Sequence, residues 1–405
     1  MYSMFSFAKK TFTSRQGVVI LNGKRTAIGS FMGKLSTVQA PLLGSACIDG
    51  ALQASKVNKE EVQEVIMGNV LSAGLGQAPA RQAAIKAGLK PSTICTTVNK
   101  VCSSGLKAIT LGAQSIMLED SEIVVAGGFE NMSLVPHYSY LRKAFTYGNP
   151  MSYDGILLDG LSNSFDGKTM GLCAEKTNKD LKIGRAENDE YCIQSYERTL
   201  NCMKKGLFQK EIVSISFEAK KGVKENFNED EEPTKFLKEK IPNLKPVFEK
   251  DGTITAANSS KINDGGAAVV LMNEKLAKDR GLRAVARIIG YADAELEPVD
   301  FSIAPSSAVT KLLKKCNMSI KDIDYFEFNE AFASVAIANM KLLGLNSSKV
   351  NLHGGAVAMG HPVGMSGARL VLSLINVLQE INGRYGVVAI CNGGGGASSI
   401  LIERL

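Results

Sequence analysis

Short apolar runs alternate with amphipathic segments along most of the chain. Four such runs predict buried strands, at residues 17–20, 65–68, 96–100 and 123–126. Apolar residues that recur every three or four positions predict helices, at residues 42–53, 79–87 and 105–118. Asn22-Gly23 follows the first run and predicts a turn. Strands that alternate with helices in this way indicate an α/β fold with βαβ units and a mostly parallel sheet.

The same order of elements returns near the C-terminus. Three segments match later ones in sequence, 59–65 with 320–326, 98–99 with 350–351, and 124–128 with 387–390. The offsets are 261, 252 and 263 residues, and differences in loop length account for their spread. We therefore expect a duplicated α/β unit. Its predicted parts are an N-terminal half at 17–130 and 251–282, an inserted segment at 131–250, and a C-terminal half at 283–405.

The inserted segment differs from the two halves in composition. A polar helix is predicted at residues 185–203, and the last third of the segment is rich in charge, including Lys235 and Lys240. Charge runs of this kind are usually a solvated surface. The alternative is that the lysines after Pro233 contact a phosphorylated ligand.

The overall composition excludes several classes of protein. Of 405 residues, 45% are hydrophobic and 21% are charged, which is typical of a globular protein with a large core. Only 11 residues are Pro, and no apolar stretch reaches the roughly 18 residues of a membrane helix. The net charge of +7 comes without a nucleic-acid motif, so DNA or RNA is not the expected partner. A small polyanion such as a phosphorylated cofactor suits this charge.

Residues 1–16 resemble a targeting segment more than a part of the fold. They contain three basic residues among Ser, Thr and Phe, and the first acidic residue of the chain is Asp49. A basic, acid-free start of this kind is typical of a mitochondrial transit peptide. We therefore expect the mitochondrial matrix as the location, with a cytoplasmic enzyme that has a frayed tail as the alternative. The C-terminal Glu403-Arg404-Leu405 is not the peroxisomal signal.

Two of the eight cysteines lie in segments that suggest chemistry. No CxxC pair occurs, so neither a disulfide scaffold nor an obvious zinc site is expected. Cys102 follows a predicted strand and opens a predicted helix, where backbone N–H groups and the helix dipole stabilise a thiolate. A buried structural cysteine is the alternative there. Cys391 precedes a glycine run that lacks the Lys-Ser/Thr of a P-loop and the spaced acid of a Rossmann site.

The chain has three histidines, and two of them, His353 and His361, lie in one glycine-rich segment. A rigid Gly-His-Pro turn presents His361 as a general base needs to be presented. No nearby Cys/His/Asp cluster completes a metal site. Two cysteines, this histidine and a polar strand end at Asn329-Glu330 suggest covalent acyl transfer. One thiol is the expected nucleophile, His361 is its base, the second thiol moves a proton, and glycine N–H groups hold an oxyanion.

Four segments resemble the signature blocks of the thiolases. They are Asn99-Lys100-Val101-Cys102-Ser103-Ser104-Gly105, Asn329-Glu330-Ala331-Phe332, Gly360-His361-Pro362 and Cys391-Asn392-Gly393-Gly394-Gly395-Gly396. The resemblance covers nearly the whole chain, from about residue 17 to residue 405. Within the family, residues 353–357 and the Asn392/Ala397 form of the last block are most similar to the mitochondrial acetoacetyl-CoA thiolases.

The resemblance implies a fold of two duplicated halves in five layers, αβαβα, and a reversible ping-pong Claisen condensation. Two acetyl-CoA molecules would give acetoacetyl-CoA and CoA, with no redox cofactor. Cys102 would take the acetyl group while His361 accepts its proton, and Cys391 would deprotonate the second acetyl-CoA. His361 and a water held by Asn329 would form one oxyanion hole. The N–H groups of Cys102 and Gly393 would form the other.

The resemblance also implies binding residues in and near the inserted segment. The positions that match CoA-binding residues are Tyr196, Lys235, Lys240 and Ser260. The mitochondrial subtype holds a potassium ion, mainly through backbone oxygens, at positions that correspond to Tyr196, Ala256, Ala257, Ser259 and Val357. Residues 131–166 would supply the contacts of a homotetramer.

Two positions bear on substrate preference. Phe301 matches a position associated with the acceptance of 2-methylacetoacetyl-CoA, and Thr169 stands where many thiolases have a histidine that lines the acyl pocket. Two alternatives therefore stay open, a long-chain 3-ketoacyl-CoA thiolase of β-oxidation and a catalytically silent acyl-CoA or lipid-binding protein. A ketoacyl synthase is disfavoured because Cys391 supplies a second thiol.

Overall fold

The computed structural model describes residues 16–142, 147–218 and 224–405, so nearly all of the predicted targeting segment lies outside the described residues. Eleven strands join in one sheet. Its main strands, in sheet order, are β13 (Tyr325–Phe328), β14 (Tyr385–Asn392), β15 (Gly396–Arg404), β12 (Ala286–Glu295), β1 (Val18–Thr26), β11 (Asn263–Asn273), β5 (Ile123–Asn131), β3 (Glu64–Gly68) and β4 (Ile94–Val98). Two short strands, β2 (Gly29–Ser30) and β8 (Ile212–Val213), pair with β11 and β1.

The prediction of a mostly parallel sheet is wrong. Parallel pairs join β13 to β14, β3 to both β4 and β5, and β8 to β1, whereas every pair from β14 across to β5 is antiparallel. One cause lies in the glycine run that follows Cys391. Gly394 and Gly395 adopt positive φ angles of 87° and 90°, which lets β14 turn directly into β15 as a hairpin.

The predicted turn at Asn22-Gly23 is also wrong, because β1 continues through it to Thr26. The register instead shifts between Ile20 and Asn22, which marks a β-bulge. The strand β12 has the same irregularity, between Ile288 and Gly290. Each strand therefore continues through its bulge and does not end there.

The two halves repeat the same order of elements, which confirms the predicted duplication. The helices of the first half are α1 (Ala40–Ser55), α2 (Pro79–Lys86) and α3 (Ser104–Met117), and those of the second are α7 (Ala304–Lys315), α8 (Ala333–Leu343) and α10 (Ser366–Glu380). A short 3-10 helix precedes β3, and another precedes β13. The matching bulges in β1 and β12 belong to the same repeat.

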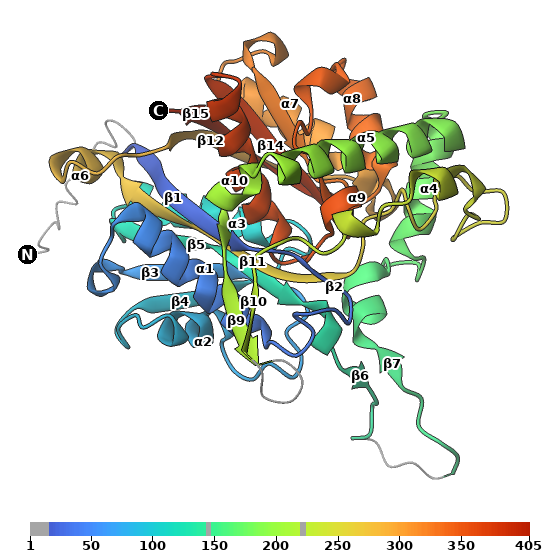
Figure 1. Ribbon diagram of the computed structural model, residues 1–405, viewed down its shortest axis with the longest axis horizontal. Helices are drawn as coiled ribbons and strands as arrows, with labels where there is room; N and C mark the ends of the chain where they lie inside the picture. The colour runs from blue at the N-terminus through green and yellow to red at the C-terminus, as the bar shows by residue number, and fades with distance from the viewer. Residues whose placement is uncertain (1–15, 143–146, 219–223) are drawn as a thin grey trace, which may run out of the picture.

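The helices and the two parts of the sheet form five layers (Figure 1). The helices α1 and α2 pack on the outer face of the first half, and α7 and α8 pack on the outer face of the second. Between the two parts lie α3 and α10, which pack against each other at the centre of a large apolar cluster. Close approach requires glycine there, because a Cβ at Gly367 would lie 2.4 Å from the backbone nitrogen of Leu106. The predicted αβαβα arrangement is confirmed.

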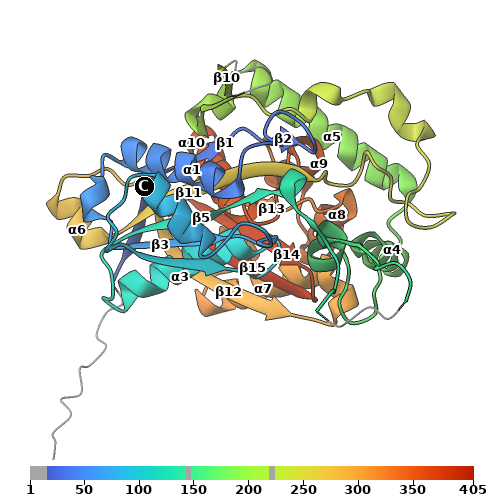
Figure 2. The same ribbon diagram turned by 90° about the horizontal axis from the view of Figure 1, so that it is seen from below.

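The inserted segment forms α4 (Met170–Asp180), α5 (Arg185–Lys204) and two small hairpins. One hairpin pairs β6 (His137–Tyr138) with β7 (Tyr153–Asp154) and projects from the body, and the other pairs β9 (Ile215–Glu218) with β10 (Lys224–Phe227) (Figure 1). The helix α4 lies at the opposite end of the molecule from α6 (Glu274–Asp279) in both views (Figure 2). None of the helices in the described ranges has the length and apolarity needed to cross a membrane.

A buried arginine fixes the inserted segment to the first half. Arg25 in β1 is inaccessible to solvent, and its guanidinium contacts Glu211 at 2.6 Å and Asp230 at 2.8 Å. The Asp230 contact is bidentate, with the second bond at 3.0 Å. Glu211 and Asp230, both from the inserted segment, thus neutralise the buried guanidinium of Arg25 in the first half.

Candidate active site

Cys102 lies in a strained turn between β4 and α3. Val101, the residue before it, has a φ of 46°, a left-handed conformation that is rare for a β-branched side chain. Two short hydrogen bonds hold this conformation. The Val101 N–H donates to Asn99 Oδ1 at 2.9 Å, and Ser104 Oγ donates to the Val101 carbonyl at 2.6 Å. The turn therefore fixes the direction in which the Cys102 thiol points.

Burial outweighs the expected stabilisation of a Cys102 thiolate. It raises the pKa of the thiol to about 11, although the backbone N–H groups of Gly393 and of Cys102 itself act in the opposite direction. The thiol is therefore protonated near neutral pH and needs a base before it can attack. The same two N–H groups lie where they can hold the oxyanion of a thioester bound at this sulfur.

His361 is held as a neutral base. Its Nδ1 lies 2.6 Å from Ser366 Oγ, and that hydroxyl donates its own hydrogen to the Pro362 carbonyl at 2.9 Å. Ser366 is thus the acceptor, so Nδ1 carries the hydrogen and Nε2 keeps its lone pair, which faces the Asn329 amide. Burial lowers the pKa of His361 to about 3, which favours the neutral ring. Asn329 Nδ2 lies 3.3 Å from Nε2, as expected for a pair that shares one side of an oxyanion hole.

Cys391 lies at the end of β14, beside the glycine hairpin. It is buried with Met170, Phe301 and Phe332 in one apolar cluster. Burial raises the pKa of its thiol well above the ordinary value, and a charge on Cys102 raises it further. The two thiols, 289 residues apart in sequence (391 − 102 = 289), thus interact electrostatically, and a hydrogen bond between Ser103 and Asn392 joins the segments that carry them.

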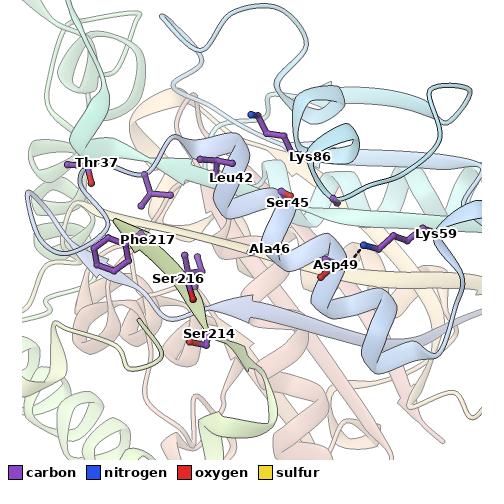
Figure 3. A pocket seen from close by; sticks show the side chains of 13 residues that line it. Thr37, Leu42, Ser45, Ala46, Asp49, Lys59, Lys86, Ser214, Ser216 and Phe217 are labelled. Atoms are coloured by element: carbon purple, nitrogen blue, oxygen red, sulfur yellow. Dashed lines mark ion pairs between the residues drawn. The ribbon is translucent and has the colours of Figure 1, made fainter. Parts of the chain in front are cut away.

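A small cavity of about 220 Å³ lies beside His361. Its lining includes His361, Ser260 and Thr169, together with the apolar side chains of Phe248 and Phe332. Phe301, the residue implied in 2-methyl acceptance, lies in the adjoining apolar cluster with Cys391. A larger cavity of about 810 Å³ lies elsewhere, between α1 and β9, and Figure 3 shows its Lys59–Asp49 ion pair. None of the predicted site residues lines that second cavity.

Two buried glutamates hold the loops around the candidate site, and no sequence motif singled out the first of them. Glu130, at the end of β5, accepts bonds from the backbone N–H groups of Val70, Leu71 and Gly364 at 3.0, 3.1 and 3.0 Å. It therefore fixes the loop that carries His361 to the loop after β3. Burial raises its pKa to about 7.

Glu330, from the Asn329 block, plays a similar part on the other side of the site. It accepts bonds from Tyr191 Oη at 2.9 Å, Ser195 Oγ at 2.7 Å and the Val357 N–H at 3.1 Å. Ser103 makes a third contact between the loops of the site, because its hydroxyl donates to Asn392 Oδ1 at 2.9 Å. Ser103 thus joins the Cys102 turn of the first half to the Cys391 hairpin of the second.

The residues expected to bind CoA lie in and near the inserted segment. Tyr196 of α5 stacks on Phe236, with ring centroids 4.5 Å apart. Lys235 is exposed and contacts Glu232 and Ser30, and Lys240 is exposed in a neighbouring 3-10 helix. Ser260 instead lines the small cavity. The structure therefore places Ser260 at the catalytic cavity and the two lysines on the surface.

The positions expected to hold potassium already surround a cation of the chain. Lys261 Nζ donates to the carbonyl oxygens of Ala257, Ser259 and Val357 at 2.9, 2.8 and 2.8 Å. It also lies 5.2 Å from the centroid of the Tyr196 ring. These residues therefore do not fit a potassium ion, because an ammonium group takes up the oxygens that would bind it. Within the described ranges, no group of three or more His, Cys, Asp or Glu residues could hold another metal ion.

Comparison with known proteins agrees with this geometry. Residues 18–275 match the model of the thiolase N-terminal domain, and residues 282–404 match that of the thiolase C-terminal domain. A solved structure, the Acat5 thiolase of Ascaris suum in complex with coenzyme A, superposes with a TM-score of 0.91 at 43% identity and covers 96% of this chain and 100% of its own.

Three curated relatives extend over nearly the whole chain. A probable acetyl-CoA acetyltransferase of Dictyostelium discoideum is 48% identical over 99% of this chain and 98% of its own length. A mitochondrial acetyl-CoA acetyltransferase of Bos taurus is 47% identical over 98% of this chain and 95% of its own. A cytosolic acetyl-CoA acetyltransferase of Gibberella zeae is 49% identical over 96% of this chain and 98% of its own length. The chain belongs to the thiolase family.

Proposed function

We propose that the protein is an acetyl-CoA C-acetyltransferase, which condenses two acetyl-CoA molecules to acetoacetyl-CoA and CoA and catalyses the reverse cleavage. The observation that carries the proposal is the pair of hydrogen bonds that hold His361 and Ser366. Ser366 donates to the Pro362 carbonyl and accepts from His361 Nδ1, which leaves Nε2 as the basic nitrogen in a site with one buried thiol, one partly buried thiol and two backbone N–H donors. That set of groups is what acyl transfer between thiols needs.

In the first half of the reaction, Cys102 attacks the thioester carbon of acetyl-CoA. His361 Nε2 takes the thiol proton, and the N–H groups of Cys102 and Gly393 stabilise the tetrahedral oxyanion. The bond between the carbonyl carbon and the CoA sulfur then breaks. Cys391 gives its proton to the departing sulfur, so that CoA leaves as a thiol and acetyl-Cys102 remains.

In the second half, the Cys391 thiolate removes a proton from the methyl group of the second acetyl-CoA. Its strongly raised pKa makes it a base of the strength that this weakly acidic carbon requires. His361 and a water on Asn329 stabilise the enolate oxygen, and the enolate carbon attacks acetyl-Cys102. The Cys102 sulfur leaves and recovers its proton from His361, which restores the starting state.

The size of the cavity supports a short acyl group. Its volume of about 220 Å³ is below the range of about 300–1,000 Å³ that is usual for drug-sized ligands. Two phenylalanines in its lining, Phe248 and Phe332, restrict it further. The proposed CoA contacts are Tyr196, Lys235, Lys240 and Ser260.

The test is CoA-dependent cleavage of acetoacetyl-CoA, 2-methylacetoacetyl-CoA and a long-chain 3-ketoacyl-CoA by the wild-type protein and by Cys102→Ala. Fast cleavage of the short substrates alone, lost in the variant, is the expected result. Fast long-chain cleavage would assign the protein to β-oxidation. No cleavage of any substrate by folded wild-type protein would favour a silent acyl-CoA or lipid-binding protein.

The proposal extends to assembly and location. Exposed apolar side chains around the β6–β7 hairpin, including Tyr140, Leu141 and Met151, support the homotetramer. Light scattering of the purified protein tests it, and a monomer would contradict it. The basic segment at residues 1–16 supports the mitochondrial matrix, with the cytoplasm as the alternative. A fluorescent-protein fusion made with and without this segment tests the location.

A further inference from the structure

Lys261 uses every hydrogen of its ammonium group on backbone oxygens. Its three donors match three acceptors, the carbonyls of Ala257, Ser259 and Val357, all within 2.9 Å. The acceptors come from two segments about 100 residues apart in sequence (357 − 257 = 100), so the side chain joins parts of the chain that are distant from each other. Lys261 is only partly exposed, and its ammonium group has no freedom left to serve another partner.

The charge of Lys261 is balanced by dipoles and not by an ion pair. Among the residues that the structure describes, no carboxylate lies within ion-pair distance of it. The face of the Tyr196 ring, 5.2 Å away, adds a cation–π contact. Backbone carbonyls together with an aromatic face form an environment for a weakly hydrated monovalent cation, as the carbonyl rings of potassium channels do.

Burial disfavours the charged form of Lys261, yet the side chain stays protonated near neutral pH. Burial lowers the pKa of Lys261 to about 8, while the charges of Cys192, Glu232 and Glu330 act to raise it. A lysine that forms no ion pair with any described residue, although it lines the small cavity beside His361, needs a reason for its position. The reason is the loop of residues 257–261, whose carbonyl oxygens the ammonium group binds.

The loop of residues 257–261 contacts both sides of the catalytic site. The Lys261 carbonyl accepts the N–H of His361 at 3.2 Å, and the Ser260 N–H donates to the Ala331 carbonyl at 3.0 Å. Val357, the third acceptor of the ammonium group, belongs to α9 (Ala356–Met359), four residues before His361. Lys261 therefore acts on the catalytic histidine from two directions, through its own carbonyl and through α9.

We propose that the ammonium group of Lys261 is a built-in substitute for a bound monovalent cation. It orders the loop of residues 257–261, and with it Ser260 and His361, without any added potassium. Lys261 is thus a positioning residue, since it acts through the loop and not on the reacting atoms. The kinetic part of this inference rests on the proposed acetyltransferase function, whereas the structural part does not.

The test compares Lys261→Ala with a matched control, Lys315→Ala. Lys315 makes contacts of the same kind far from the site, because its Nζ donates to the Tyr291 carbonyl at 3.0 Å and lies 4.5 Å from the centroid of the Tyr291 ring. The melting temperature and the KM for acetoacetyl-CoA are measured for both variants and the wild type. Each is measured in potassium chloride and in sodium chloride at equal ionic strength.

The wild type and Lys315→Ala are expected to give the same values in both salts. Lys261→Ala in sodium is expected to melt at a lower temperature and to show a KM raised at least ~10-fold, because three hydrogen bonds to a charged group are lost. Potassium should restore both values in this variant, because it can enter the vacated ring of carbonyls. A kcat that changes less than the KM would fit a positioning role.

Two results would overturn the inference. One is a wild type that is stabilised or activated by potassium over sodium, and the other is a Lys261→Ala variant that matches the wild type in sodium. If Lys261→Ala does not fold in either salt, the salt comparison on the wild type alone decides, since equal melting temperatures support the inference and a potassium-dependent difference refutes it. The melting temperatures also separate this inference from the proposed function, since they need no turnover.

Discussion

Gly360 precedes His361, the proposed general base, and offers a sharp test of how the His361 loop is held. Its φ is 104°, and a Cβ at this position would lie 2.1 Å from Asn263 Oδ1. That oxygen accepts the His361 N–H at 3.0 Å, and the Asn263 amide donates to the Gly29 carbonyl at 2.9 Å. Replacement of Gly360 by Ala should therefore strain the backbone and also displace the side chain that anchors His361.

The two effects have separable sizes. An L-residue in this region of backbone space costs about 1–3 kcal/mol. Displacement of Asn263 removes one of the two acceptors of the buried His361 N–H, because the Lys261 carbonyl still accepts it at 3.2 Å, and this loss costs about 0.5–1.5 kcal/mol more. We therefore expect Gly360→Ala to lower the free energy of unfolding by about 1.5–4.5 kcal/mol. A shift of the imidazole by about 1 Å would also reduce kcat by about 100-fold.

Gly281→Ala is the matched control. Gly281 also has a positive φ, 63°, but a Cβ there would have nothing within 4 Å. Only the conformational cost of about 1–2 kcal/mol applies, and kcat should not change. Unfolding in denaturant and kcat for acetoacetyl-CoA cleavage are measured for both variants. The reasoning fails if Gly360→Ala is no less stable than Gly281→Ala, or if it keeps the kcat of the wild type.

Three further predictions concern the thiols and the buried arginine. Cys391→Ser should still be labelled by radioactive acetyl-CoA at Cys102 but should lose condensation, and loss of labelling in a folded variant would refute the division of roles. Because the pKa of Cys102 is raised to about 11, its thiolate is scarce at neutral pH and becomes more abundant as pH rises. Alkylation of Cys102 by iodoacetamide, followed by peptide mass spectrometry, should accelerate about tenfold per pH unit between about pH 7 and 9, and a plateau in that interval would contradict it. Arg25→Met leaves two buried carboxylates unpaired and should lower the free energy of unfolding by about 3–5 kcal/mol in denaturant titrations, whereas Arg384→Met, which removes an exposed ion pair, should cost about 0–1 kcal/mol.

The elements with a strong local signal were predictable from the sequence. The predicted helix at 105–118 is α3 at Ser104–Met117, and the one at 79–87 is α2 at Pro79–Lys86, where proline occupies the first turn. The candidate catalytic residues could be singled out for a related reason, and their roles stay predictions. Cys102 follows β4, Cys391 lies near the end of β14, and the small residues beside each of them are visible in the sequence itself.

Features that depend on distant parts of the chain were not predictable. Asn22-Gly23 has the composition of a turn, yet pairing with Val270 and Val269 of β11 keeps it inside β1, directly after the bulge. The antiparallel centre of the sheet depends on which strands pair with each other, and the hydrophobic periodicity of a single strand does not predict its partners. Lys261 follows a stretch of small residues in sequence, and only the fold brings the carbonyl of Val357 to it.

The central layer also has a consequence for the synthesis of the protein. The face of α3 that packs on α10 has no cover until residues 366–380 have been made, roughly 250 residues later, which takes about 13–50 s at about 5–20 residues per second. During that interval the nascent chain presents an apolar helix face that is prone to aggregation. The finished enzyme has a covered core, whereas the growing chain exposes this face of α3 until its partner helix leaves the ribosome.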